Sequence, residues 1–293
     1  MSSANFVSGC IYGVLSVLQF IINALVLVVT LRFKEYGSVT YRIIKNMCIS
    51  CLLQQAVFFI GALMSFSNSN FDYTFEKICG AVLQSSWILY ISLSLTLAID
   101  RMLTFVCAHL SSPVSYCLLS LSWLHASGHL IVLLLPNFGI EYCYEFEADL
   151  MCAGWYYDSQ PGSYIVADIE PFILLALECS IFFCYIVVLV RLVKLKSMTN
   201  AKRQISSFRT ELRILVIALL AFIYECSLIV FVHFGPELLP QSTSVDVLIS
   251  TLWMLDSGLF SFVTLVINTS IRGRLLSMLT RNKNVTVVTS FHS

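Results

Sequence analysis

The sequence predicts an all-α membrane protein, a bundle of seven transmembrane helices with its N-terminus outside the cell and its C-terminus in the cytoplasm. Three observations predict this class. Apolar residues make up 58% of the 293 residues and charged residues only 12%, against roughly 45–50% and 25% in an average soluble domain. The apolar residues fall in seven long blocks. The basic residues collect on one side of those blocks.

Each apolar block has the length of a membrane-spanning helix. A hydrocarbon core of about 30 Å needs about 20 helical residues, and the blocks are too long for buried strands and too uniformly apolar for surface helices. They leave no room for a soluble domain, so residues 1–293 are interpreted as one seven-helix domain with a short cytoplasmic tail, 272–293. The helices are expected at 6–31, 43–66, 78–106, 114–135, 164–190, 214–234 and 245–267.

The topology follows from the lysines and arginines, because short cytoplasmic loops carry an excess of both. Sixteen of the 17 lie on the side reached by the ends of the first, third and fifth helices, and Lys77 is the exception. An odd number of spans then places the N-terminus outside. The first ten residues contain no lysine or arginine, and the helix after them is about twice as long as a secretory h-region, so we expect it to stay as an anchor. The basic connection 194–213 is expected to extend the fifth and sixth helices, either to dock a protein or to touch anionic lipid.

No pattern in the sequence indicates chemistry on a substrate. It contains no recognisable nucleophile with its base, phosphate-cradling loop or metal cluster. We therefore expect no enzymatic activity, no cofactor, no metal and no nucleic-acid partner, and the lipid bilayer is the first partner that the composition implies.

Polar residues at helix ends and inside the apolar blocks are the candidate functional groups. Asp100 and Arg101 stand at the cytoplasmic end of the third block, where an aspartate can hold a guanidinium until helices separate and the arginine meets a partner protein. The alternative is a snorkelling arginine that only marks the membrane edge. In the first block Asn23 and Val26 form an Asn-x-x-Val pattern, and the alternative there is an amide satisfied by a neighbouring helix carbonyl.

A ligand pocket is expected in the outer half of the bundle. Placing an ionisable residue against lipid costs free energy, so such residues within membrane spans usually face the interior of the helix bundle. We expect this of Glu178, Glu225 and Asp256. Residues three apart share a helix face, so aromatic and polar side chains stack on two helices. They form an aromatic, weakly polar cavity for a small organic molecule, or else ordinary interhelical hydrogen bonds and ring packing. The expected lining is Gln84, Trp87, Tyr90, Tyr224, Glu225, Trp253 and Asp256.

Three cysteines lie where an oxidising compartment can reach them. Cys79, at the outer end of the third helix, is expected to pair with a cysteine of the long connection 136–163, because that side faces the lumen during synthesis. Cys143 and Cys152 are the alternative partners. Such a bridge would pin the connection over the mouth of the pocket.

Several short motifs resemble those of G-protein-coupled receptors. Asp100-Arg101-Met102 is similar to the Asp-Arg-Tyr element of that superfamily. Residues 268–272, Asn-Thr-Ser-Ile-Arg, match a pattern of nematode chemoreceptors. The connection with Cys143-Tyr144 and Trp155-Tyr156-Tyr157, followed by Asp168, is similar to nematode serpentine receptors of class X. The chain departs from rhodopsin-type receptors because the last helix lacks the Asn-Pro-x-x-Tyr proline and tyrosine, and the second helix has Gln54 and Gln55 where many receptors have an aspartate.

The resemblance implies a rhodopsin-like bundle that acts as a chemosensory receptor. It would bind a small external ligand and signal through a heterotrimeric G protein at the cell membrane, with the sensory cilium as one expected place. Coupling and activation would involve Asp100, Arg101, Asn268 and Arg272. The family arrangement favours Cys143 over Cys152 as the partner of Cys79. The ligand, the G-protein subtype, and the choice between monomer and homo- or hetero-oligomer stay open.

Three alternatives belong to other classes. The first is a receptor-like membrane protein without G-protein signalling. The second is a proton-coupled carrier that uses Glu178, Glu225 and Asp256, but its expected inverted repeats or paired broken helices do not occur in the sequence. The third is a seven-helix channel of reversed orientation, which the distribution of basic residues contradicts.

Overall fold

The computed structural model describes residues 3–143, 146–147, 150–151, 153–198, 205–238 and 243–280. Within these residues, seven helices are long and apolar enough to cross a membrane. The chain is therefore a multi-pass membrane protein, and the predicted seven-helix architecture is confirmed. The helices are α1 (Ser3–Arg32), α2 (Val39–Ser67), α3 (Tyr73–Val106), α4 (Ala108–Leu134), α5 (Pro161–Met198), α6 (Ile205–Leu238) and α7 (Thr243–Ile267).

The helices extend beyond the predicted apolar blocks mainly around the basic connection 194–213. The helix expected at 164–190 continues as α5 to Met198, and the one expected at 214–234 begins as α6 at Ile205. Helical structure therefore extends into the basic connection, as predicted. Elsewhere the largest difference is at α4, which begins at Ala108, six residues before its expected start.

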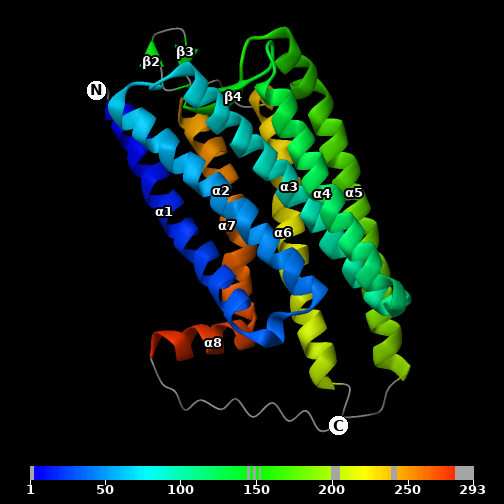
Figure 1. Ribbon diagram of the computed structural model, residues 1–293. Coiled ribbons are helices and arrows are strands. Elements are labelled where there is room, and N and C mark those ends of the chain that lie inside the picture. Colours follow the sequence, from blue (N-terminus) through cyan, green and yellow to red (C-terminus); the bar gives the residue numbers. More distant parts are fainter. Residues whose placement is uncertain are drawn as a thin grey trace.

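Two different structures close the two ends of the bundle (Figure 1). Short strands cover the end at which α1 begins, and a short helix, α8 (Thr269–Leu279), lies across the opposite end. These are called the hairpin end and the α8 end. Between them α3 runs through the centre, because 83% of its apolar window is buried inside the protein, against 17% for α4.

The connection between α4 and α5 contains strands that the sequence did not predict. β1 (Ile140–Cys143) pairs antiparallel with β4 (Gly154–Tyr157), with Ile140 opposite Tyr157. β2 (Phe146–Glu147) pairs with β3 (Leu150–Met151). Successive side chains of a strand point to opposite faces. In β1 this alternation buries Ile140 and Tyr142 and turns the residues between and after them away.

Hydrogen bonds fix the β1–β4 hairpin and its preceding residue Ala153 to four helices. Glu76 Oε1 of α3 accepts from the Tyr142 amide at 2.6 Å, and the Tyr142 hydroxyl lies 2.7 Å from Ser65 Oγ of α2. The Ala153 carbonyl accepts from the Tyr12 hydroxyl at 3.1 Å and from Ser250 Oγ of α7 at 3.0 Å. Burial raises the pKa of Tyr142 to about 12, so its hydroxyl stays neutral at any physiological pH. The hairpin is a fixed wall of the bundle.

The predicted disulfide between Cys79 and Cys143 is wrong. Cys143 is disulfide-bonded, but Cys79 is a free and buried thiol. The strand alternation explains the error, because Cys143 follows Tyr142 and points away from the bundle, whereas Cys79 lies on α3 next to Gly80, under the backbone of Ile140. The other candidate, Cys152, lies outside the described residues.

α8 begins at a capped turn and packs against the end of α1 and the turn that follows it. Asn268 Oδ1 accepts from the amides of Ser270 at 3.1 Å and Ile271 at 3.3 Å, which satisfies two of the unpaired amides at a helix start. Ile271 is fully buried with Val29 and Tyr36, the latter in a short 3-10 helix, η1 (Lys34–Tyr36). The cap ends α7 and turns the chain across the bundle.

Asn23 links α1 to α7. Its Nδ2 donates to the Ser257 carbonyl at 3.1 Å, and its Oδ1 accepts from Ser261 Oγ at 2.6 Å. The amide is therefore satisfied by a neighbouring helix, the structural alternative that the sequence left open.

Candidate functional site

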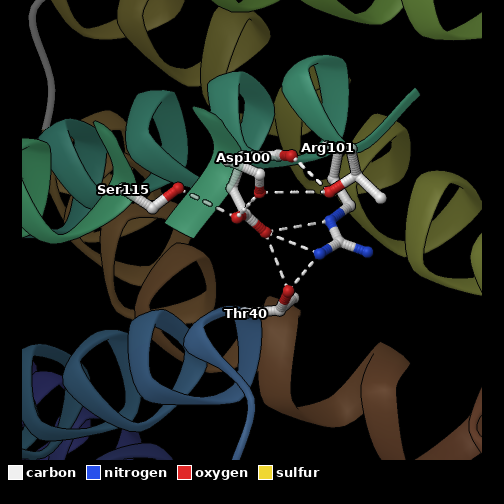
Figure 2. Close-up of polar contacts among 6 residues, drawn as sticks. Thr40, Asp100, Arg101 and Ser115 are labelled. Atoms are coloured by element: carbon white, nitrogen blue, oxygen red, sulfur yellow. Dashed lines mark hydrogen bonds and ion pairs between the residues drawn. The ribbon is translucent and has the colours of Figure 1, made fainter. Parts of the chain in front are cut away.

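At the α8 end, Asp100 organises a buried polar cluster that joins three helices. Its Oδ2 accepts from Thr40 Oγ1 of α2 at 2.8 Å, and its Oδ1 accepts from Ser111 and Ser115 of α4, both at 2.9 Å. Arg101 Nη2 lies 2.6 Å from the same Oδ2 and also contacts Thr40. We call these five residues the Asp100 network (Figure 2).

The Asp100 network is closed to its surroundings. Asp100 is 1% exposed and Arg101 6%, and each carboxylate oxygen has two donors, those of Oδ1 from α4 and those of Oδ2 from α2 and α3. A buried charge pair is stable only when its remaining hydrogen-bonding capacity is filled, and here hydroxyl groups fill it. The pair predicted from the sequence is therefore a locked contact, in which the guanidinium lies against the carboxylate and Thr40.

Asn268 and Arg272, predicted to act with this pair, make contacts of their own at the α7–α8 junction. Asn268 is the N-cap of α8. Arg272 is exposed, and its Nη1 donates to the Val266 carbonyl in the last turn of α7 at 2.9 Å. Both contacts stabilise helix ends, so the geometry gives these two residues a structural role.

At the hairpin end, a cavity of about 250 Å³ lies between α3, α5, α6, α7 and the β-hairpin. We call it the hairpin-end cavity. Of the predicted lining residues, Gln84, Trp87 and Trp253 border it. The Trp87 and Trp253 rings meet edge to face with centroids 5.3 Å apart. Its described lining is Gln84, Trp87, Ile140, Trp155, Tyr156, Tyr157, Ala167, Glu170, Leu228, Val232, Asp246, Ile249, Ser250 and Trp253.

Glu170 of α5 is a buried carboxyl group in the wall of this cavity. It is 5% exposed. Its Oε2 accepts from the Tyr157 hydroxyl at 2.7 Å, and its Oε1 accepts from the Gln84 amide. Burial and the adjacent Glu170 charge both raise the pKa of Tyr157, so this hydroxyl keeps its proton and remains a donor. α3, α5 and β4 therefore meet at one carboxyl group.

Four predicted lining residues lie elsewhere. Tyr90 is fully buried, and the Tyr224 hydroxyl donates to the Leu252 carbonyl at 2.9 Å, which ties α6 to α7. Glu225 borders a separate void of about 10 Å³. Asp256 is 1% exposed and faces Trp87. These residues share helix faces with the cavity residues, as predicted, but their positions lie deeper in the bundle than the cavity.

The three carboxyl groups predicted to face the interior do so, and they form one cluster. Glu225 faces Glu178 of α5, together with Tyr90 and Ser94 of α3, and Asp256 lies close enough to Glu225 to interact electrostatically. All three are at most 2% exposed. Both Asp256 oxygens and one oxygen each of Glu178 and Glu225 have no protein hydrogen-bond partner.

Sequence comparison gives no relative for this chain, whereas structural comparison does. No family model matches the sequence, and no curated protein is similar to it. A crystal structure of squid rhodopsin superposes on it with a TM-score of 0.72 over 94% of this chain and 85% of the rhodopsin chain, at 17% sequence identity. The chain has the rhodopsin fold.

Within this rhodopsin fold, sequence reasoning missed most of the cavity lining. Glu170 obeys the rule that selected the other three carboxyl groups, since it is ionisable and lies in an apolar block. Asp168, which the motif comparison selected, is exposed on the same helix. Trp155, Tyr156 and Tyr157 were noticed as a motif, but without the β1–β4 pairing nothing indicated that they line a cavity. Asp246, at the start of the block expected at 245–267, satisfies the same rule, whereas no pattern marked Ser250.

Proposed function

We propose that this protein is a G-protein-coupled receptor, a chemosensory one of the nematode serpentine type, with the hairpin end outside the cell. The observation that carries the proposal is the position of two sites on one central helix. Trp87 in the cavity and Arg101 in the locked pair both belong to α3, about 21 Å apart along its axis at 1.5 Å per residue. A bundle of the rhodopsin fold with a cavity at one end and a restrained arginine at the other is suited to transmit a binding event.

The orientation is supported by the described charges. Lys77 lies at the hairpin end, whereas the basic residues of α8, of the α1–α2 turn and of the far end of α5 lie at the α8 end. Short cytoplasmic segments carry such an excess of positive charge. The cavity then faces outward and the Asp100 network faces the cytoplasm, where a heterotrimeric G protein is found.

Ligand binding acts through differential affinity for two packings of the bundle. The cavity borders α3, α5, α6 and α7, so a ligand that fits one arrangement of these helices better shifts the population toward it. In the arrangement described here, Asp100 and Thr40 hold Arg101. The signalling arrangement is one in which this contact opens and the planar guanidinium binds the G protein.

The test is guanine-nucleotide exchange on co-expressed G proteins while a panel of small water-soluble and volatile compounds is applied. Arg101→Ala should abolish the response at unchanged surface expression, and Arg101→Lys should reduce it because lysine lacks the planar donor fork. Arg274→Ala is the matched control, since Arg274 is a cation at the same end in an exposed ion pair with Glu35. A response that survives Arg101→Ala contradicts the proposal. No response from any G protein favours a receptor-like protein without this signalling.

A proton-coupled carrier is the second candidate, supported by the convergence of Glu178, Glu225 and Asp256. Buried carboxyl groups that face one another within a membrane are a recurrent feature of proton relays. If the protein is a carrier, ligand-dependent proton flux into proteoliposomes should occur without any G protein and should be lost in Glu225→Gln.

A further inference from the structure

We propose that the hairpin-end cavity binds a small organic cation, a protonated amine or quaternary ammonium, between Glu170, Asp246 and aromatic rings. This inference rests on the receptor function proposed above and specifies the class of its ligand.

The charge of the cavity is the first argument. Both Glu170 oxygens accept hydrogen bonds, from Gln84 and Tyr157, and both of these donors are neutral groups. A buried carboxylate inside a membrane protein is costly unless a positive charge compensates it. The described lining contains no lysine, arginine or histidine. A cationic ligand would therefore supply a charge that the described walls do not.

The aromatic lining is the second argument. Three indole and two phenol rings border the cavity, and a cation is attracted to such rings, most strongly to tryptophan. Trp155 Nε1 lies beside Gly61 of α2, and Trp87 faces Asp256. Neither Gly61 nor Asp256 lines the cavity. These two indoles therefore direct their N–H groups, which would repel a cation, away from the ligand.

A second carboxyl group lies across the cavity from α5. Asp246 of α7 faces Tyr156 of β4, so acidic groups approach the ligand from two helices. At the hairpin end, the described charged residues are mostly acidic, with Lys77 as the exception, and an excess of one sign of charge raises the local concentration of the opposite ion. These acidic residues include the exposed Asp72 and Glu141 and the buried Glu76 and Asp158.

The size of the cavity limits the ligand. Its volume of about 250 Å³ is below the range of roughly 300–1,000 Å³ typical of sites for drug-sized molecules. At roughly 30 Å³ for each water-sized group, a compact amine with a short apolar tail fits.

Three molecules with one carbon skeleton test the inference: isopentylamine, isopentanol and isovalerate, which are cationic, neutral and anionic at neutral pH. Binding is measured by intrinsic tryptophan fluorescence of the purified full chain in lipid nanodiscs. The amine should bind at least about tenfold more tightly than the alcohol, which corresponds to about 1.4 kcal/mol. Glu170→Gln should remove this preference and leave alcohol binding within about threefold. Asp168→Asn, which removes the same charge from the exposed side of α5, should keep the preference.

The inference is overturned if the alcohol or the carboxylate binds as tightly as the amine, or if none of the three binds. It is also overturned if the preference for the amine survives in both Glu170→Gln and Asp246→Asn. Because the titration contains no G protein, its result is independent of the receptor function. Amine binding without nucleotide exchange on any G protein would support the cation site and contradict the receptor function. Nucleotide exchange driven by neutral ligands alone would support the receptor function and contradict the cation site.

Discussion

The Asp100 network and the hairpin-end cavity each contain a buried carboxyl group, but they surround it in opposite ways. Asp100 has an adjacent arginine and three hydroxyl donors from two further helices. Glu170 has only neutral donors, in a wall with room beside it. Since a buried charge needs compensation, the first site is complete within the chain and the second is suited to a ligand. The Asp100 network joins α2, α3 and α4, whereas the open space beside Glu170 is the basis of the proposed ligand site.

The largest expected effect is the loss of the Asp100 carboxylate. Asp100→Ala leaves the guanidinium buried without its partner, which should lower the free energy of unfolding by about 3–5 kcal/mol. Denaturant titration in detergent micelles measures this. Asp100→Asn should cost less because its amide oxygen still accepts from the α4 serines, and Asp168→Ala, at an exposed position, should change little. A loss below about 1 kcal/mol for Asp100→Ala would mean that the network does not hold α2, α3 and α4 together.

The next effect concerns the wall of the cavity. A methyl group at Gly80 of α3 would overlap the Ile140 carbonyl oxygen and lie 3.0 Å from its carbon, so Gly80→Ala should displace β1. The expected destabilisation is about 1–3 kcal/mol, the usual cost of overpacking, together with weaker binding of isopentylamine. Gly128→Ala is the matched control, because nothing lies within 4 Å of that position and alanine should stabilise α4 by roughly 0.5–1 kcal/mol. Equal behaviour of the two variants would contradict the close packing of hairpin and helix.

A smaller effect is expected at the start of α8. Asn268→Ala removes the acceptor for two backbone amides and should cost about 1 kcal/mol. Hydrogen exchange at the Ser270 and Ile271 amides should become faster. Asn268→Asp keeps an acceptor oxygen and should keep the protection. If the alanine variant instead abolished signalling without faster exchange, Asn268 would have the activation role that the motif implied.

The smallest effect belongs to the exposed pair between Glu35 and Arg274, whose atoms lie 2.7 Å apart. The hydrogen bond and charge of Arg274 hold the pKa of Glu35 below its usual value. The folded protein therefore gains stability from the pair above the unfolded pKa of glutamate, about 4.3, and loses it as pH falls through the lower folded value. Arg274→Ala should cost about 0.2–1 kcal/mol at neutral pH and low salt, and this difference from wild type should vanish once the pH has fallen below the folded pKa of Glu35. A difference that persisted there would show that packing of Arg274 on Phe33, rather than charge, stabilises α8.

What the sequence could predict depended on whether the signal was local. Membrane-length apolar blocks and the pairing of the adjacent Asp100 and Arg101 depend on local sequence, and the structure shows both the spans and the pair. The depth of a residue within the bundle cannot be predicted from its local sequence, because α3 is buried on nearly all sides and its polar residues mark no single face. Gln84 and Trp87 were therefore correct cavity residues while Tyr90, one turn further, was too deep.

The long connection shows the same limit. The disulfide prediction failed because the direction of Cys143 depends on strand alternation in β1, and the strands themselves depend on pairing between residues 140–143 and 154–157. Such pairing joins distant positions, which single-sequence patterns do not specify. Glu170 was missed for another reason, since the rule for ionisable residues in apolar blocks would have selected it.

The central claim is that the hairpin-end cavity controls the Asp100 network, and nucleotide exchange by the purified protein reconstituted with a G protein tests it most directly. Saturating isopentylamine should accelerate exchange for the wild type. Glu170→Gln at one end and Arg101→Ala at the other should each remove the acceleration, while Asp168→Asn and Arg274→Ala should preserve it. Exchange that does not depend on the amine, or acceleration that survives in either test variant, would contradict coupling between the two ends.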